Sequence, residues 1–425
     1  MRSVSIARCA FALLVGAIGS FLEAGAVDGA PTLDALILDS PKTLVETPGQ
    51  LSPPALQFNQ EGHLYVAWFE KQEGGANVKV ARVEGEAVSR AIQVNRDGEG
   101  PGAVHQSPGV AVGAGGSLYV TWSSANQTPG AMFASDLRLA RSSDGGRTFA
   151  SPVPVNDDGL PISHSFEDIT VVPEGDVYLA WLDGRNKERS GAGILFARST
   201  DHGRSIERNL QIDGMACPCC RPMLAKAPDG HLWVAWRKVL DGNVRDIVIA
   251  KSADRGRSFD PPRLVRKDNW VFTACPHRGP SLAFDRFGRM YVGWYTEGTD
   301  EQPRLFVATS DDQGNTFTEP VPLHVSTTSV PDQLRMAVHP DGAIVAVWEE
   351  LTGVRKETVM RLSMDRGRSF GPVKKLSAAA KAEHPTVAID RSGRVALSWS
   401  EHTFPMNRLL VQQGQLDLNE ITGKP

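Results

Sequence analysis

The densest cluster of reactive side chains lies in the segment MACPCCRP, which contains Cys217, Cys219 and Cys220. A further cysteine, Cys275, lies in TACPHRGP, two residues before His277. Thiolates and imidazoles bind soft or borderline ions such as Cu(I) and Zn(II), and Cys-x-x-Cys spacing lets two sulfurs reach one ion. In an oxidising compartment the same four cysteines would instead form disulfides, with three possible pairings. The residue types alone leave both chemistries open.

The N-terminus has the pattern of an export signal. Two arginines in MRSVSIAR precede the apolar stretch CAFALLVGAIGSFL, and EAGA offers a cleavage site after Ala26. We therefore expect residues 1–26 to be a signal peptide and residues 27–425 to form a single domain in the periplasm or outside the cell. Retention as an N-terminal anchor is the alternative, although the stretch is short for a membrane span. No other segment is expected to cross a membrane.

The charge of the chain excludes some classes of partner. The 425 residues include 45 Lys and Arg and 49 Asp and Glu, which gives a net charge of −4. No run of basic residues is present that would predict binding to nucleic acid or an anionic membrane. We expect a small molecule, a metal ion or a glycan as the ligand.

A repeated apolar element must position the reactive residues. Units of roughly 55 residues each contain a β-branched, aromatic run such as HLYVAW or SLYVTW. A shorter apolar run precedes it, and two more runs follow, so each unit predicts four antiparallel strands. Seven units predict an all-β propeller of seven blades, in which KTLVE near the N-terminus supplies the fourth strand of the last blade. The repeated runs end at Trp68, Trp122, Trp181, Trp236, Trp294, Trp348 and Trp399.

A second repeat has the form Ser-x-Asp-x-Gly-x-Ser/Thr followed by an apolar residue. Its polar side chains can bond nearby backbone N–H groups, so it is typical of a turn. This is the Asp box, and with it the chain resembles the sialidase (BNR-repeat) superfamily. The resemblance implies a propeller of six blades, which stays as the alternative to the repeat count, and an exo-acting glycoside hydrolase activity. The copies begin at Ser142, Ser199, Ser252, Ser310 and Ser363.

The propeller predicts which residues share a face. The loops that enter the first strand of each blade open on one face, together with the loops that follow the tryptophan strands. Aligned on the first apolar run, His105, His164, Cys219 and His277 occupy the same register in successive units. We therefore predict a metal site on this face, with copper as the first choice of ion and zinc as the second. Its predicted ligands are Cys217, Cys219, Cys220, Cys275, His277, His164 and His105.

The family resemblance implies a different use of the same face. Sialidases hold a carboxylate with three arginines, attack with a Tyr–Glu pair and use an Asp as acid and base. The Arg-Ile-Pro element of the family is absent, which leaves it open whether the chain is an enzyme. A non-catalytic propeller that binds glycan or protein through disulfide-stapled loops is a third alternative. The residues implied for catalysis are Asp183 as the acid, Tyr295 and Glu297 as the nucleophile pair, and Arg185, Arg221 and Arg278 as carboxylate ligands.

Overall fold

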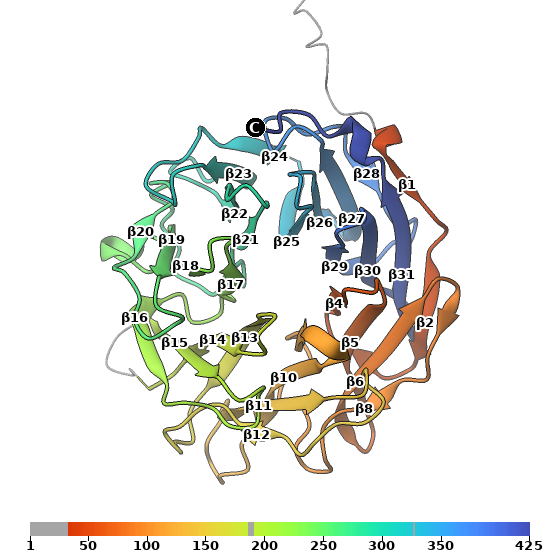
Figure 1. Ribbon diagram of the computed structural model, residues 1–425, viewed down its shortest axis with the longest axis vertical. Helices are drawn as coiled ribbons and strands as arrows, with labels where there is room; N and C mark the ends of the chain where they lie inside the picture. The colour runs from red at the N-terminus through yellow and green to blue at the C-terminus, as the bar shows by residue number, and fades with distance from the viewer. Residues whose placement is uncertain (1–32, 186–190, 326–327) are drawn as a thin grey trace, which may run out of the picture. The chain divides into compact units, whose positions relative to one another are not determined.

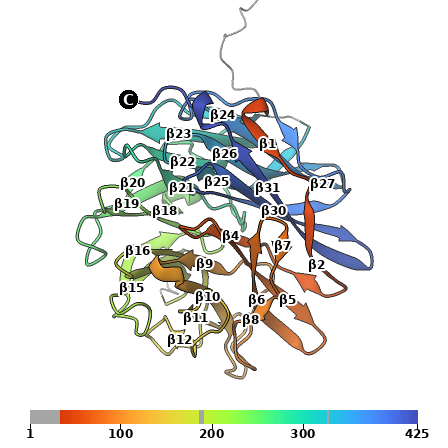
Figure 2. The same cartoon turned by 45° about the vertical axis from the view of Figure 1, so that its right-hand side comes forward.

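The computed structural model describes residues 33–185, 191–325 and 328–425. They form seven antiparallel sheets arranged as blades in a ring (Figures 1 and 2). Five sheets have four strands each, and the first and last blades carry additional short strands. The seven-bladed prediction is confirmed, and the six-bladed alternative is wrong. The predicted signal peptide lies outside the described residues.

The first four blades follow the order of the chain. Each runs from an inner strand near the axis to an outer strand. Blade 1 comprises β3 (Gln50–Leu51), β4 (Ala55–Phe58), β5 (Leu64–Gln72), β6 (Gly75–Glu84), β7 (Ala87–Val88) and β8 (Ile92–Gln93). Blade 2 comprises β9 (Gly109–Val112), β10 (Leu118–Ala125), β11 (Ser135–Ser142) and β12 (Val153–Pro154). Blade 3 comprises β13 (His164–Val171), β14 (Val177–Asp183), β15 (Ala192–Ser199) and β16 (Leu210–Ala216), and blade 4 comprises β17 (Met223–Lys226), β18 (Leu232–Arg237), β19 (Ile247–Ser252) and β20 (Arg263–Leu264).

The remaining blades complete the ring. Blade 5 comprises β21 (Ser281–Phe284), β22 (Met290–Thr296), β23 (Arg304–Ser310) and β24 (Val321–Val325). Blade 6 comprises β25 (Val330–Val338), β26 (Ile344–Thr352), β27 (Arg355–Ser363) and β28 (Lys374–Lys375). Blade 7 comprises β29 (Ala382–Ile389), β30 (Arg394–Thr403) and β31 (Met406–Leu416), with β1 (Leu36–Leu38) and β2 (Lys42–Thr47). Short 3-10 helices are η1 (Leu33–Ala35), η2 (Ala114–Gly116), η3 (Asp241–Asn243) and η4 (Leu418–Glu420).

The two ends of the described chain close the ring in blade 7. Strand β2 pairs antiparallel with β31, with Lys42 opposite Val411, and β1 pairs with a later part of the same strand. Figure 1 shows β1 and β2 beside β31 at opposite ends of the colour scale. The prediction that KTLVE supplies the last strand is confirmed. Closure pairs a strand that would otherwise present an open sheet edge.

The tryptophan strands form the core between neighbouring blades. All seven of their tryptophans are almost completely buried, and the apolar clusters join residues of adjacent blades. In three blades the carboxylate two residues later accepts the indole N–H. The pairs are Trp181 with Asp183, Trp348 with Glu350 and Trp399 with Glu401. None of the helices that the structure describes has the length and apolar character needed to span a bilayer.

The Asp boxes act as turn devices, as their composition predicts. In the first copy, Asp144 Oδ1 accepts from the backbone N–H groups of Arg147 and Thr148, and the Thr148 hydroxyl donates to Oδ2. The N–H of Gly146 donates to Ser142 Oγ. The hydroxyls of Ser142 and Thr148 also lower the pKa of Asp144, because they donate to its charged form. The boxes of Asp201, Asp254, Asp312 and Asp365 repeat these side-chain contacts.

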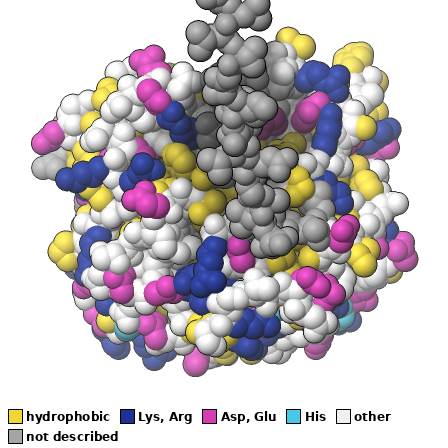
Figure 3. Space-filling model, turned by 90° about the horizontal axis from the view of Figure 1, so that it is seen from above, with side chains coloured by type: hydrophobic (Ala, Val, Ile, Leu, Met, Phe, Trp, Pro, Cys, Tyr) yellow, Lys and Arg dark blue, Asp and Glu magenta, His cyan; other side chains and the backbone are white. Residues whose placement is uncertain are grey.

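The surface carries charges of both signs. On the face shown in Figure 3, Lys and Arg side chains are interspersed with Asp and Glu side chains and with scattered apolar ones. Such a surface provides no single-sign field for attracting a polyanion.

Candidate functional site

A cavity of about 400 Å³ lies where the loops before the inner strands meet. Residues from all seven blades line it. Blades 1, 2, 4 and 5 contribute residues just before the inner strand, and blades 3, 6 and 7 contribute residues within the first part of that strand. This common register is the one used to align the units in the sequence. The polar lining residues include His105, Gln106, Cys219, Arg221, His277, Arg278, Tyr295, Gln333, Arg335 and His384, and the apolar ones include Pro53, Phe166 and Leu334.

Four lining residues have left-handed backbone conformations that non-glycine residues rarely adopt. They are Phe166, His277, Gln333 and His384, with φ of 59°, 55°, 51° and 59°. In blades 3, 6 and 7 the strand register shifts at this position, which is the signature of a β-bulge. Bulges re-aim side chains, and here all four line the cavity.

The bulge of blade 3 changes which residue reaches the cavity. The alignment of the units predicts that His164 reaches the cavity, but Phe166 lines the cavity in its place. The rings of His105, Phe166 and His277 have centroids 6.0–6.4 Å apart. The pKa of His105 is lowered by burial and by the neighbouring His277 and His384. A lowered pKa favours the neutral imidazole, which is the form that binds metal ions.

Three cysteine sulfurs converge beside this cavity. Cys217 Sγ lies 2.7 Å from Cys220 Sγ and 3.8 Å from Cys219 Sγ, and all three atoms lie within 4.8 Å of one another. The side chains of Cys217 and Cys220 are fully buried, whereas Cys219 borders the cavity. All four cysteines of the described chain are free, and Cys275 is exposed and lies outside the triad. The predicted disulfides are therefore not shown.

Two arginine side chains lie near the sulfur of Cys217. Arg245 Nη1 donates to Cys217 Sγ at 3.3 Å. The pKa of the Cys217 thiol is lowered, because the thiols of Cys219 and Cys220 donate to it and because Arg237 lies nearby. The pKa values of Cys219 and Cys220 are raised. The surroundings of Cys217 therefore favour its thiolate form, and a thiolate is the form that binds metals.

The residues implied for glycoside hydrolysis are only partly brought together. Arg221, Arg278 and Tyr295 line the cavity, and the Tyr295 hydroxyl donates to Glu297 Oε1. The Arg278 guanidinium lies 3.9 Å from the centroid of the Tyr295 ring. Burial raises the pKa of Tyr295, and Arg278 opposes this effect. Arg335, which also lines the cavity, has a pKa lowered to about 10 by burial and by Arg221.

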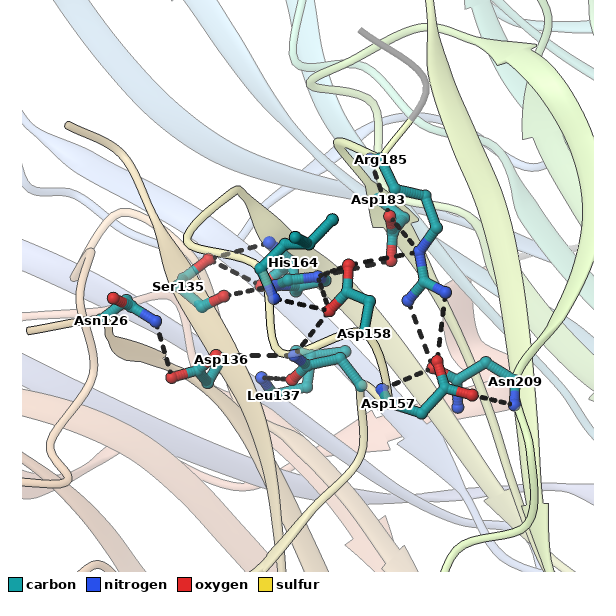
Figure 4. Close-up of polar contacts among 12 residues, drawn as sticks. Asn126, Ser135, Asp136, Leu137, Asp157, Asp158, His164, Asp183, Arg185 and Asn209 are labelled. Carbon is teal, nitrogen blue, oxygen red and sulfur yellow. Dashed lines mark hydrogen bonds and ion pairs between the residues drawn. The ribbon is translucent and has the colours of Figure 1, made fainter. Parts of the chain in front are cut away.

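Asp183, Arg185 and His164 lie in a separate ionic network (Figure 4). Asp183 Oδ1 accepts from Arg185 Nε at 2.8 Å, and Asp183 Oδ2 accepts from the indole N–H of Trp181. His164 Nε2 faces Asp158 at 3.2 Å. None of these residues lines the cavity. The structure therefore does not bring the predicted acid or His164 to the predicted site.

The comparisons with known proteins agree with the architecture. The family profile described as a BNR repeat-like domain matches residues 62–271. The chain is a BNR-repeat β-propeller. No curated protein is similar enough in sequence to match this BNR-repeat propeller.

Several solved structures share the fold of this BNR-repeat propeller. The PL25 ulvan lyase is 11% identical, with a TM-score of 0.56 over 91% of this chain and 98% of that one. The Hadza microbial sialidase Hz136 is 17% identical, with a TM-score of 0.51 over 84% and 74% of the two chains. The α-L-arabinanase of Penicillium chrysogenum is 16% identical, with a TM-score of 0.51 over 77% and 97%. At these identities the likeness establishes the fold and leaves the activity to be argued from residues.

One buried acid of the propeller was not found from the sequence. Glu167, beside the bulge residue Phe166, is 1% exposed, and neither carboxylate oxygen has a hydrogen-bond partner in the structure. The only sequence signal is the acidic pair that it forms with Asp168 inside an inner strand, where apolar residues are usual. Burial raises the pKa of Glu167 to about 7, and the charge of Arg221 opposes this effect.

We expect Glu167 to make stability depend on pH. The native state keeps the proton up to a pKa of about 7, whereas the unfolded state releases it near the ordinary value of 4.5. The free energy of unfolding should therefore fall as the pH rises between these two values. Glu167→Gln removes this loss and should be more stable than wild type at pH 8 by about 1–3 kcal/mol, with little difference at pH 4.5.

Urea unfolding across this pH range measures the effect. Glu174→Gln is the matched control, since Glu174 is exposed in the adjoining turn and should leave the pH profile unchanged. Parallel pH profiles for wild type and Glu167→Gln would contradict the prediction.

Proposed function

We propose that this BNR-repeat propeller is an exported protein that binds a soft transition metal, Cu(I) first and Zn(II) second. The observation that carries the proposal is the convergence of three buried sulfurs, those of Cys217, Cys219 and Cys220, beside the cavity that Cys219 lines. Thiolates select soft ions, and Cu(I) is the softer of the two.

The sulfur geometry supports a shared ion. Bonds of about 2.3 Å to one ion place neighbouring sulfurs roughly 3.8–4.0 Å apart. The Cys217–Cys219 separation of 3.8 Å already matches, and the 2.7 Å between Cys217 and Cys220 opens with a small rotamer change. Cys219 borders the cavity that His105 and His277 also line, so one of these imidazoles is the natural further ligand.

The test is an anaerobic titration of the reduced protein with Cu(I) against a chromogenic competitor. We expect one Cu(I) per chain, and we expect Cys217→Ser and Cys219→Ser to weaken binding at least tenfold, because each removes a ligand. His277→Ala should weaken it less. Cys275→Ser is the matched control, because Cys275 is exposed and outside the triad.

Two outcomes contradict the proposal. One is wild-type affinity in both triad variants. The other is a free-thiol count on protein from its native compartment that finds Cys217 joined to Cys220 and no copper bound, which would favour the disulfide-stapled binding module.

A sialidase-type glycoside hydrolase is the second candidate. It is favoured by the Tyr295–Glu297 hydrogen bond and by the three arginines Arg221, Arg278 and Arg335 that line the cavity. Arginine forks suit a carboxylate ligand. Asp183 is held elsewhere, so this candidate has no identified acid. Turnover of a fluorogenic sialoside that Tyr295→Phe abolishes would establish the hydrolase instead.

A further inference from the structure

A second cluster of metal-ligating side chains lies apart from the cavity, at the contact of blades 2 and 3 (Figure 4). Asp158 comes from the loop between β12 and β13, His164 begins β13 and Asp183 ends β14. His164 and Asp183 are directly opposite in the strand register. One ligand atom from each of the three residues lies within 4.8 Å of the others.

The distances between these atoms suit one small ion. His164 Nε2 lies 3.2 Å from Asp158 Oδ1 and 3.7 Å from Asp183 Oδ2. An ion with bonds of about 2.1 Å places neighbouring ligand atoms roughly 3.0 Å apart in an octahedron and roughly 3.4 Å apart in a tetrahedron. The observed separations agree with these values to within a few tenths of an ångström.

The hydrogen bonding of His164 leaves one ring nitrogen directed at the carboxylates. Its Nδ1 lies 2.5 Å from the backbone oxygen of Ser135, which can only accept, so Nδ1 carries a proton. In a neutral ring Nε2 is then unprotonated, and its lone pair faces the carboxylates of Asp158 and Asp183. The His164 side chain is 0% exposed. This arrangement requires either a second proton or a cation. Metal-bound histidines commonly donate their other N–H to a backbone carbonyl in this way.

The charges of the cluster also favour a cation. The single guanidinium of Arg185 is shared by the carboxylates of Asp157, Asp158 and Asp183. With a neutral His164 the three carboxylates exceed Arg185 by two negative charges. Asp157 is exposed to solvent, so the buried excess on Asp158 and Asp183 is one charge. Uncompensated buried charge is unfavourable, so a divalent cation would balance the cluster.

Arg185 occupies one oxygen of each carboxylate. Its Nε lies 2.8 Å from Asp183 Oδ1 and 3.5 Å from Asp158 Oδ2, whereas Asp183 Oδ2, which also accepts the indole N–H of Trp181, and Asp158 Oδ1 lie 3.7 Å and 3.2 Å from His164 Nε2. We propose that Asp158, His164 and Asp183 bind a divalent first-row cation of oxygen and nitrogen preference, such as Mn²⁺ or Zn²⁺. This site shares no ligand with the cysteine triad, and it has oxygen and nitrogen ligands in place of sulfur.

The experiment is a titration of the reduced wild-type protein with Mn²⁺, followed by the electron paramagnetic resonance signal of the free ion. Mn²⁺ is the probe because carboxylates suit it and thiolates select softer ions. We expect one Mn²⁺ per chain, and we expect His164→Gln and Asp183→Asn to weaken binding at least tenfold. Cys219→Ser should bind Mn²⁺ as wild type does.

Asp136→Asn is the matched control. Asp136 belongs to the same network through Asn126 and Asn156, but it does not contact the proposed ion. If Asp183→Asn does not fold, Asp158→Asn replaces it, because Asp158 lies in a loop. The proposal is overturned if the protein binds neither Mn²⁺ nor Zn²⁺ at a site independent of the cysteines. In that case His164 would be paired with the carboxylates as an imidazolium. It is also overturned if Asp136→Asn weakens binding as much as the ligand variants.

Discussion

A chain that begins at residue 49 is expected to lose cooperative folding, because it lacks both strands that close the ring. Without β1 and β2, strand β31 becomes an open edge along its pairing with residues 36–47. Leu36 and Leu416, which are opposite each other and 3% and 2% exposed, lose their contact. We expect the free energy of unfolding to fall by more than about 3 kcal/mol, since strand pairing and core burial are lost together.

Thermal unfolding followed by circular dichroism measures this effect. A chain that begins at residue 33 keeps both strands and is the matched control. If the shorter chain unfolds cooperatively within a few degrees of the control, the N-terminal strands are dispensable and the closure argument fails.

Arg237→Met is expected to be among the most damaging single substitutions. The Arg237 side chain is 1% exposed and donates to the backbone oxygens of Arg278 at 2.9 Å, Arg245 at 2.7 Å and Tyr295 at 2.7 Å. Its guanidinium also lies 4.7 Å from the centroid of the Trp270 ring. Methionine fills similar space but leaves three carbonyls without this donor. We expect a loss of about 3–5 kcal/mol in the free energy of unfolding.

Arg355→Met is the control for this substitution. The Arg355 side chain is 52% exposed and pairs with Glu357, which is 22% exposed, so its loss should change stability by less than about 1 kcal/mol. Urea unfolding of both variants gives the comparison. Equal, small effects would show that solvent or neighbouring donors replace the Arg237 hydrogen bonds.

Much of the candidate site could be predicted from the sequence. The repeat fixes the register of every blade, so residues before the inner strands can be assigned to one face without a structure. His105, Cys219 and His277 were predicted in this way, and all three line the cavity. The position of Cys275 was not predictable, because it lies in a loop whose path the repeat does not determine.

The failure at His164 has a definite physical cause. A bulge between Ser165 and Asp168 moves the register, so Phe166 reaches the cavity and His164 lies in the ionic network. The left-handed conformation of Phe166 is unfavourable for its residue type and is imposed by packing, which local propensity cannot reveal. Local propensity also cannot reveal the raised pKa of Glu167, because that shift comes from burial in the folded protein.

The number of blades, the turns that join their outer strands and the strand that closes the ring could all be predicted from the amino-acid sequence. These features depend on local patterns: the short β-branched and aromatic runs, the Asp-box turn chemistry and the spacing of the tryptophan strands. Which side chains share a site depends instead on the tertiary structure. It separated Asp183 from Tyr295 and joined Cys217 to Arg245, because these contacts arise between segments distant in the chain. Their strength depends on burial and charge, which exist only once the blades have packed.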